Sequence, residues 1–305
     1  MHISILLGTY NGAQYIQEQL DSFKSQSHSD WDLWASDDGS TDHTILIVKE
    51  FASKIGGNRV HQLQGPRRGF VANFLSILSN PALQADAYAY SDQDDIWMKD
   101  KLERAATFLQ SVPNSKPALY CSRTLYVDKS DKPLQTSQAY SRPAVFANAL
   151  VQNIASGNTM VFNDAARSLL LQLGEGVDID LHDWLTYMLV TGAGGEVFFD
   201  LQPSVRYRQH SKNLIGMNIG IRAKISRIHM LFKGRFKDWN ERHVATLQKI
   251  GSLLTLENKT VLEQFARARQ THGFRRLFEF KKSGVYRQTL SNNIAFYIAA
   301  MVGKV

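Results

Sequence analysis

Three carboxylates crowd into four positions of the segment YSDQDDIW, residues 90–97. They are Asp92, Asp94 and Asp95, and they follow the apolar-leaning run ADAYAY, which predicts a strand. Like charges this close repel one another, so the cluster needs a partner of opposite charge. Asp92 and Asp94 lie two positions apart at the end of the predicted strand, where both can turn toward one cation. Oxygen ligands favour Mg²⁺ or Mn²⁺, and such an ion would neutralise a bound diphosphate.

Two other interpretations of this acidic cluster stay open. The carboxylates could cap a following helix, DDIWMKDKLERAATFLQ, because the N-terminus of a helix favours negative charge. Haloacid-dehalogenase-type phosphatases also use an Asp-x-Asp pair, as nucleophile and acid. In those enzymes the pair lies nearer the start of the chain and is normally followed by Thr or Val, whereas here Ile96 follows Asp95.

Polar clusters also end the other predicted strands. They are TYNG at residues 9–12, SDDGSTD at 36–42 and GPRRG at 65–69. In the second cluster Asp37 or Asp38 could accept a hydrogen bond from a base N–H or a ribose hydroxyl. Ordinary turn chemistry would explain each cluster taken alone. The sequence has no G-x-G-x-x-G after its first strand and no G-x-x-x-x-G-K-[ST], so the common dinucleotide and P-loop fingerprints are absent.

Strands and helices alternate along the first 90 residues. The predicted strands are HISILLGTY, WDLWASDD, RVHQLQG and ADAYAY, and the predicted helices between them are AQYIQEQLDSFKSQS, HTILIVKEFASKI and GFVANFLSILSN. This alternation predicts an α/β fold with a mostly parallel sheet flanked by helices on both faces. Ligands bind such sheets beyond the carboxyl ends of the strands. We therefore expect the four polar clusters to converge on one rim.

The composition is that of a globular protein of one large or two ordinary domains, with 305 residues, 44% of them hydrophobic. The single cysteine, Cys121, excludes an intramolecular disulfide and a Cys-rich zinc site, and it favours a reducing compartment. The sequence contains no run of about 18 apolar residues, so no membrane span is predicted. The apolar N-terminal segment lacks the features of a signal peptide and predicts a strand.

The net charge of +7 is unevenly distributed. Residues 220–305 contain 17 Lys and Arg against 5 Asp and Glu, while residues 1–219 contain 18 against 23. From about residue 217 the pattern is helical, so we expect two parts, residues 1–216 and a basic helical region at 217–305. The basic region favours an anionic partner such as membrane headgroups or a lipid-linked phosphate. A solvated basic face or a homodimer contact would also explain it. Nucleic acid is not expected, because the aromatic residues do not interleave with the basic ones.

In chain order, TYNG, SDDGSTD, GPRRGFVANF, YSDQDDIW and LHDW resemble the family 2 glycosyltransferases of the GT-A (Rossmann-like) fold, over roughly residues 1–215. SDQDDIWMKDKL, HDWLTYML and YRQHSKN are similar to bacterial rhamnosyltransferase-type members that build O-antigen (lipopolysaccharide) or capsule chains. The resemblance implies an inverting enzyme that takes a sugar from a nucleoside-diphosphate sugar, with dTDP-L-rhamnose favoured over a UDP-hexose. A non-catalytic protein that binds nucleotides or carbohydrates on the same fold is the alternative from another class.

The resemblance also implies roles for individual residues. Asp94 would bind the Mg²⁺ or Mn²⁺ ion, with Asp92 nearer the ribose and His210 as a further ligand. Asp183, in LHDW, would be the general base, although an N-cap of the helix WLTYMLV is the structural alternative. The nucleotide pocket would be lined by Thr9, Tyr10, Asn11, Asp37 or Asp38, and Arg68, and the acceptor would be contacted or oriented by His182 and Trp184.

The implied acceptor is a saccharide linked to undecaprenyl diphosphate. The protein would then be cytoplasmic and peripheral at the inner face of the cell membrane. Residues 219–236, IGIRAKISRIHMLFKGRF, mix Ile, Met, Leu and Phe with Arg and Lys, which is the composition of a helix that lies on anionic lipid.

Overall fold

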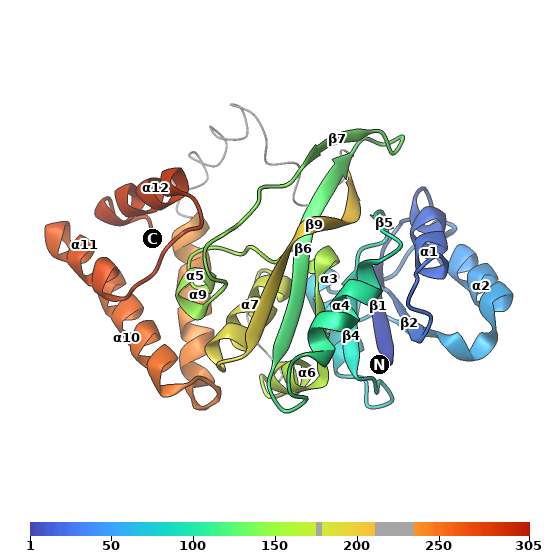
Figure 1. Ribbon diagram of the computed structural model, residues 1–305, viewed down its shortest axis with the longest axis horizontal. Coiled ribbons are helices and arrows are strands. Elements are labelled where there is room, and N and C mark those ends of the chain that lie inside the picture. The colour runs from blue at the N-terminus through green and yellow to red at the C-terminus, as the bar shows by residue number, and fades with distance from the viewer. Residues whose placement is uncertain (175–178, 211–234) are drawn as a thin grey trace.

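The computed structural model describes residues 1–174, 179–210 and 235–305, and Figure 1 shows their arrangement. Within them a nine-stranded sheet has the order β3-β2-β1-β4-β8-β6-β9-β5, with β7 paired to β6. The strands are β1 (Ile3–Thr9), β2 (Trp31–Asp37), β3 (Val60–Gln64), β4 (Ala87–Ser91), β5 (Ile96–Trp97), β6 (Ala118–Val127), β7 (Pro133–Thr136), β8 (Val161–Asn163) and β9 (Glu196–Arg208). β1 to β4 are parallel, β6 and β9 are parallel, and β8 runs antiparallel between β4 and β6. The predicted mostly parallel α/β sheet is confirmed.

Both faces of the sheet are covered. The helices in the first two thirds of the chain are α1 (Ile16–Lys24), α2 (Thr44–Ile55), α3 (Phe70–Leu78), α4 (Lys101–Gln110), α5 (Phe146–Ala149), α6 (Asp164–Leu171) and α7 (His182–Gly192). In β1, Ile5 belongs to a core with residues of α1, α2 and α4, whereas Leu6 belongs to a core with residues of α3, α6 and α7. Because neighbouring residues are buried on opposite faces, the strand reads as a continuous apolar run.

The C-terminal region is helical, as its pattern predicts. It contains α9 (Arg235–Lys249), α10 (Leu256–Gln270), α11 (Gly273–Lys282) and α12 (Leu290–Met301), which lie on one side of the sheet in Figure 1. These helices share the core of α3 and α7, and Asn258 Nδ2 donates to the carbonyls of Thr191 and Gly192 at 3.0 Å each. The expected boundary at 216–217 and most of the segment 219–236 lie outside the described residues. Among the helices that are described, none combines the length and the apolar character needed to cross a membrane.

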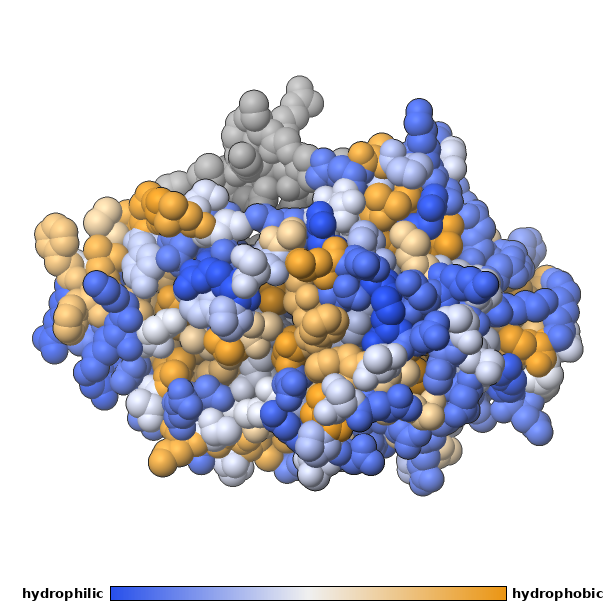
Figure 2. Space-filling model, viewed as in Figure 1, coloured by the Kyte–Doolittle hydropathy of each residue, from blue (hydrophilic) through white to orange (hydrophobic). Residues whose placement is uncertain are grey.

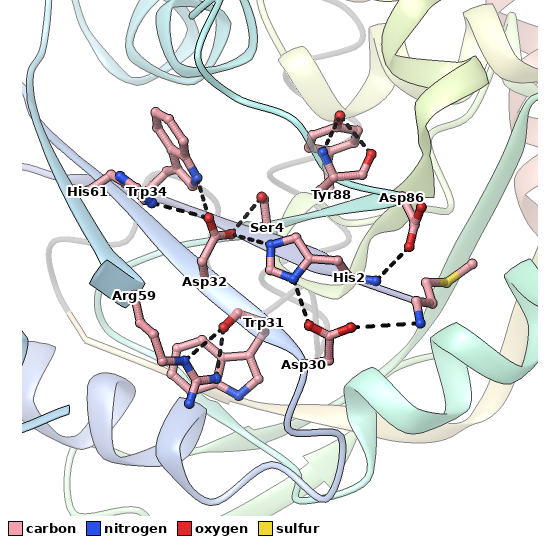
Figure 3. A network of polar contacts seen from close by, with 12 residues as sticks. His2, Ser4, Asp30, Trp31, Asp32, Trp34, Arg59, His61, Asp86 and Tyr88 are labelled. Atoms are coloured by element: carbon pink, nitrogen blue, oxygen red, sulfur yellow. Dashed lines mark hydrogen bonds and ion pairs between the residues drawn. The ribbon is translucent and has the colours of Figure 1, made fainter. Parts of the chain in front are cut away.

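A polar network ties the first three strands together near their amino ends (Figure 3). Asp32 on β2 accepts hydrogen bonds from Ser4 Oγ at 2.6 Å and from Trp34 Nε1 at 2.9 Å. His61 Nε2, on β3, lies 3.3 Å from the same carboxylate, and its ring stacks on Trp34 at 4.2 Å. One carboxylate therefore pairs two buried donors, which would otherwise be unsatisfied.

We expect Asp32→Ala to lower the free energy of unfolding by about 2 kcal/mol or more, since each buried donor left without a partner costs about 1–3 kcal/mol. Urea unfolding followed by circular dichroism measures the change. Asp30→Ala is the matched control, because that carboxylate is 60% exposed and pairs with His2 at the surface. If the two variants lost the same small amount, Asp32 would not organise these strands.

Candidate active site

The polar ends of β1, β2 and β4 lie side by side. Thr9 pairs with Asp37 in the β1–β2 register, and Leu7 pairs with Ser91 in the β1–β4 register. The side-chain amide of Gln93 links the clusters TYNG and YSDQDDIW. It accepts from the backbone N–H of Tyr10 and donates to the carbonyl of Tyr10, both at 2.9 Å. TYNG and YSDQDDIW therefore form one continuous surface.

Asp37 is the structural centre of the SDDGSTD turn. Its Oδ1 accepts from the backbone N–H groups of Gly39 and Ser40 at 3.0 and 2.7 Å. Its Oδ2 accepts from Thr9 Oγ1 at 2.8 Å and from Ser40 Oγ at 2.5 Å. A carboxylate has about four acceptor positions, so the protein itself occupies those of Asp37.

Asp38 ties the same turn to the GPRRG loop. It accepts from the backbone N–H groups of Arg67 at 2.6 Å and Gly69 at 2.8 Å, and the neighbouring Arg68 is exposed. Two of its acceptor positions are therefore free of these contacts. Between the two aspartates, Asp38 has more capacity left for a base or a ribose hydroxyl.

The three acids of YSDQDDIW have different surroundings. Asp94 is partly exposed and its Oδ2 lies 2.9 Å from His210 Nε2, and the His210 ring stacks on Tyr15 at 5.1 Å. Asp95 is fully buried and accepts from Asn158 Nδ2 at 2.6 Å. The helix that was expected to follow directly begins only at Lys101, after β5 and a turn. The alternative in which these acids cap that helix is therefore wrong.

The carboxylates of the acidic cluster lie close enough together to raise the pKa of two of them. Burial, the charge of Asp94 and then that of Asp183 raise the pKa of Asp92 to about 7. Burial and its two acidic neighbours also raise the pKa of Asp95. Lys101 is the buried cation beside them, and its Nζ lies 3.4 Å from the centre of the Trp97 ring. Burial lowers the pKa of Lys101, and the charges of Asp95 and Asp92 oppose that shift.

The donor set suits a divalent cation that also binds substrate. Asp92 and Asp94 supply carboxylate oxygens, and His210 supplies an imidazole nitrogen next to Asp94. In the part of the chain that is described, no group of three or more His, Cys, Asp or Glu side chains is arranged to hold a metal by itself. Mg²⁺ at nucleotide sites is commonly held by one or two carboxylates together with phosphate oxygens, so these residues fit such a shared site.

Asp183 lies in the first turn of α7 and is largely buried. Its Oδ2 accepts from the backbone N–H of Gly157 at 3.0 Å, and its Oδ1 accepts from that of Trp184 at 2.6 Å. Burial raises the pKa of Asp183 to about 6, although these backbone hydrogen bonds act in the opposite direction. A carboxylate with this pKa is ionised at neutral pH and is more basic than an ordinary aspartate, which suits proton abstraction.

His182 lies in an aromatic pocket. Its ring stacks on Phe74 at 4.2 Å and meets the edge of Tyr90 at 4.7 Å. Burial lowers its pKa to about 3, so the imidazole is neutral at physiological pH. Among the residues that the structure describes, neither ring nitrogen has a hydrogen-bond partner, so His182 does not orient Asp183 through a hydrogen bond.

Trp184 is a core residue. It is 4% exposed, and its Nε1 donates to the carbonyl of Ala149 at 2.6 Å. Its ring packs against Trp239 and His243 of α9. The indole N–H is therefore not available to hydrogen-bond an acceptor in this structure. The buried ring packs at the start of α7, next to Asp183.

Sequence reasoning did not single out Gln93, Lys101, Gly157 or Asn158 as site residues. Lys101 falls in an amphipathic pattern that places it at a helix surface, and Gly157 and Asn158 open the segment GNTMVFND, whose pattern predicts a strand. The signal that could have found Lys101 is its position close behind the acidic cluster, which it shares with Lys99.

A mostly parallel sheet whose carboxyl rim brings together a polar turn, an Asp-x-Asp pair and a buried carboxylate defines a glycosyltransferase of the GT-A type. Solved structures support the fold. TarS 1-349 of S. aureus in complex with UDP-GlcNAc aligns with a TM-score of 0.52 over 94% of this chain and 93% of that chain, at 15% identity. The mannosyltransferase PcManGT from Pyrobaculum calidifontis, in complex with GDP-Man and Mn²⁺, gives 0.51 over 99% and 86%, at 17% identity.

Residues 4–166, more than half of the chain, match the family model Glycosyl transferase family 2, and the protein belongs to this family. Among curated proteins it is similar to the dTDP-rhamnosyl transferase RfbG of Shigella flexneri, with 29% identity over 234 residues. That alignment covers 74% of this chain and 78% of RfbG.

Proposed function

We propose that this glycosyltransferase moves a sugar, with inversion at the anomeric carbon, from a nucleoside-diphosphate sugar to a growing bacterial surface polysaccharide of the O-antigen or capsule kind. The observation that supports the proposal is that two consecutive residues contact both the acidic cluster and Asp183: Asn158 Nδ2 donates to Asp95, and the N–H of Gly157 donates to Asp183. The expected base and the expected diphosphate-binding cluster would then serve one site. The similarity to RfbG favours dTDP-L-rhamnose as donor, and a UDP-hexose is the alternative.

Inversion needs one well-placed base. Asp183 would accept the proton of the acceptor hydroxyl while the hydroxyl oxygen attacks the anomeric carbon on the face opposite the diphosphate. The new glycosidic bond forms as the bond to the diphosphate oxygen breaks. The N–H groups of Gly157 and Trp184 each hold one oxygen of Asp183, and each oxygen keeps a second lone pair that could receive the proton.

Asp94, Asp92 and His210 would hold Mg²⁺ or Mn²⁺ together with the donor. When bound, the ion would neutralise the charge of the leaving diphosphate. The nucleoside would lie against the rim formed by TYNG, Asp38 and the loop of Arg68, with Asp37 supporting the turn. A likeness to PcManGT, whose structure contains Mn²⁺, supports a metal-dependent reaction.

Thermal-shift measurements with dTDP-L-rhamnose, UDP-hexoses and GDP-mannose, each with and without Mn²⁺, test this proposal. A ligand that binds the folded state raises the Tm, by mass action. We expect at least one donor to do so, and to a larger extent with Mn²⁺. Stabilisation by a donor without any turnover would support the non-catalytic alternative, and the absence of stabilisation by every donor would contradict the proposal.

The C-terminal helices carry an exposed apolar face that suits the expected membrane association. On α11, Phe274 and Phe278 are 86% and 66% exposed, and on α12, Ile294 and Ile298 are 52% and 51% exposed. Figure 2 shows apolar side chains gathered over these two helices beside hydrophilic ones. Residues 271–305 contain 6 Lys and Arg against 1 Glu. An apolar face bordered by cations matches an anionic lipid surface, and we propose that it brings the enzyme to a lipid-linked acceptor.

Replacing Phe274 and Phe278 together by Ser is expected to lower binding to anionic phosphatidylglycerol vesicles about tenfold or more, in sedimentation at low salt. Binding of the wild-type protein should also weaken as salt screens the cations. Leu46→Ser, at a 52% exposed position on α2, is the matched control and should bind normally. Wild-type binding by the double variant would contradict the proposal. A homodimer in light scattering that the double variant dissociates would instead identify this face as a subunit contact.

A further inference from the structure

One short turn touches both the acidic cluster and Asp183. The 3₁₀ turn η2 (Gly157–Thr159) lies between β4 and α7 in space. On one side Asn158 Nδ2 donates to Asp95 Oδ2 at 2.6 Å, and the Asn158 carbonyl accepts from Lys101 Nζ at 2.6 Å. On the other side the N–H of Gly157 donates to Asp183 Oδ2 at 3.0 Å. Two consecutive residues therefore connect Asp95, the chain neighbour of the expected metal ligand Asp94, to the expected base.

The connection has little freedom to move. Asp95 and Lys101 are fully buried, and Asn158 is 3% exposed. The second end of the Asn158 amide is also used, because its Oδ1 accepts from Ser156 Oγ at 2.8 Å. Thr159 closes the turn through its backbone N–H and its Oγ1, both of which donate to the carbonyl of Ser156. Fully paired buried amides have one orientation, so η2 is a rigid element.

Gly157 is the point of closest approach to the base. A Cβ added at this position would lie 3.2 Å from His182 Nε2 and 3.3 Å from the Cβ of Asp183. Both distances are tighter than ordinary carbon contacts. A larger residue would therefore push α7, and with it the carboxylate of Asp183, away from the turn.

We propose that Asn158 is a positioning residue for glycosyl transfer, which through η2 holds Asp183 at a fixed distance from the carboxylates of the acidic cluster. This inference rests on the proposed function. In-line attack needs the base and the departing diphosphate on opposite sides of the anomeric carbon, and a misplacement of about 1 Å can cost about a hundredfold in rate. Asn158 touches neither reactant, so it acts through Asp95, Lys101 and the neighbouring N–H of Gly157.

Asn158→Ala should lower kcat about 10- to 100-fold, while the Kd of dTDP with Mn²⁺, from calorimetry, stays within about threefold. Turnover is followed as release of dTDP from dTDP-L-rhamnose, or of UDP from the UDP-hexose that stabilises the protein, with a lipid-linked saccharide extract as acceptor. The exchange Asp95→Asn with Asn158→Asp keeps the hydrogen bond with donor and acceptor reversed. It should recover most of the lost kcat, which a double-mutant cycle quantifies.

Gly157→Ala gives a second readout that leaves Asn158 in place. It should lower kcat and leave the Kd of dTDP unchanged. If Asn158→Ala fails to fold, this variant still tests whether η2 positions Asp183. Wild-type kcat in a folded Asn158→Ala or in Gly157→Ala would overturn the inference, as would an exchange variant that recovers Tm but not kcat. Asp183→Asn separates this outcome from failure of the proposed function: if that variant is inactive while the turn variants are fully active, only the positioning role of Asn158 is lost.

Discussion

Asp183→Asn is expected to lower kcat by about 10²–10⁴-fold while the Kd of the donor stays within about twofold. The amide keeps the size of the carboxylate and retains one oxygen, which can accept from the N–H of Gly157 or of Trp184 but not from both, and it cannot take a proton from the acceptor hydroxyl. Release of nucleoside diphosphate measures turnover, and calorimetry with dTDP and Mn²⁺ measures binding. Full turnover by this variant would refute the role of Asp183 as base.

The stability of the same variant separates catalysis from folding. The pKa of Asp183 is about 6 in the folded protein, against about 4 in an unfolded chain. Because the folded pKa is raised, the favourable contribution of the protonated acid is present below about pH 4 and is lost as the pH rises through 6. At pH 8 the neutral amide removes the cost of burying an ionised carboxylate, and this offsets the loss of one of the two backbone hydrogen bonds, so the Tm of Asp183→Asn should stay close to that of the wild type. A large fall in Tm would point to a structural role.

The wild-type enzyme should also lose activity in acid through this group. We expect kcat to fall below about pH 6 with the slope of a single proton, because the protonated acid cannot act as a base. Measuring kcat from pH 5 to 8.5 with saturating Mn²⁺ tests this. A flat profile across pH 6 would mean that the proton is taken by a different group.

The second large effect concerns Asp94. We expect Mn²⁺ to tighten binding of the nucleoside diphosphate about tenfold or more in the wild type, and Asp94→Asn to remove most of that gain, because the amide has no charge to offer a cation. His210 would lose its charged partner in the same change. For dTDP, and likewise for UDP, calorimetric titration of the wild type and of Asp94→Asn with and without Mn²⁺ gives the four affinities needed.

Asp21→Asn is the matched control for Asp94→Asn, since Asp21 is an exposed aspartate on α1 whose carboxylate accepts only from Gln17 among the hydrogen bonds described. It should show the full effect of Mn²⁺. Equal nucleotide affinity with and without Mn²⁺ in the wild type would exclude Asp92 and Asp94 as a metal site for the donor.

The sheet and the order of its polar ends could be predicted because they depend on local patterns. Alternating strands and helices force parallel strands, and parallel strands bring their carboxyl ends together, so Thr9, Asp37 and Asp92 follow from the sequence. The spacing of Asp92 and Asp94 also predicts a cation site by itself, because two carboxylates two positions apart at a strand end can turn toward one ion.

The inner part of the site could not be predicted in the same way. Lys101 has the sequence context of a surface lysine, and only the packing of α4 against η2 places it beside Asp95. Trp184 lies next to the expected base, yet the packing of α9 on α7 makes it a core residue. Such positions depend on contacts between segments that are distant in the chain, which periodicity does not encode.

The configuration of the transferred sugar tests the central claim most directly. The enzyme is incubated with Mn²⁺, the donor that stabilises it and a saccharide acceptor, and the anomeric proton of the newly linked sugar in the product is assigned by NMR. A single base at Asp183 predicts a product whose anomeric configuration is opposite to that of the donor. A product with the configuration of the donor would contradict the account, because retention requires a different arrangement of catalytic groups.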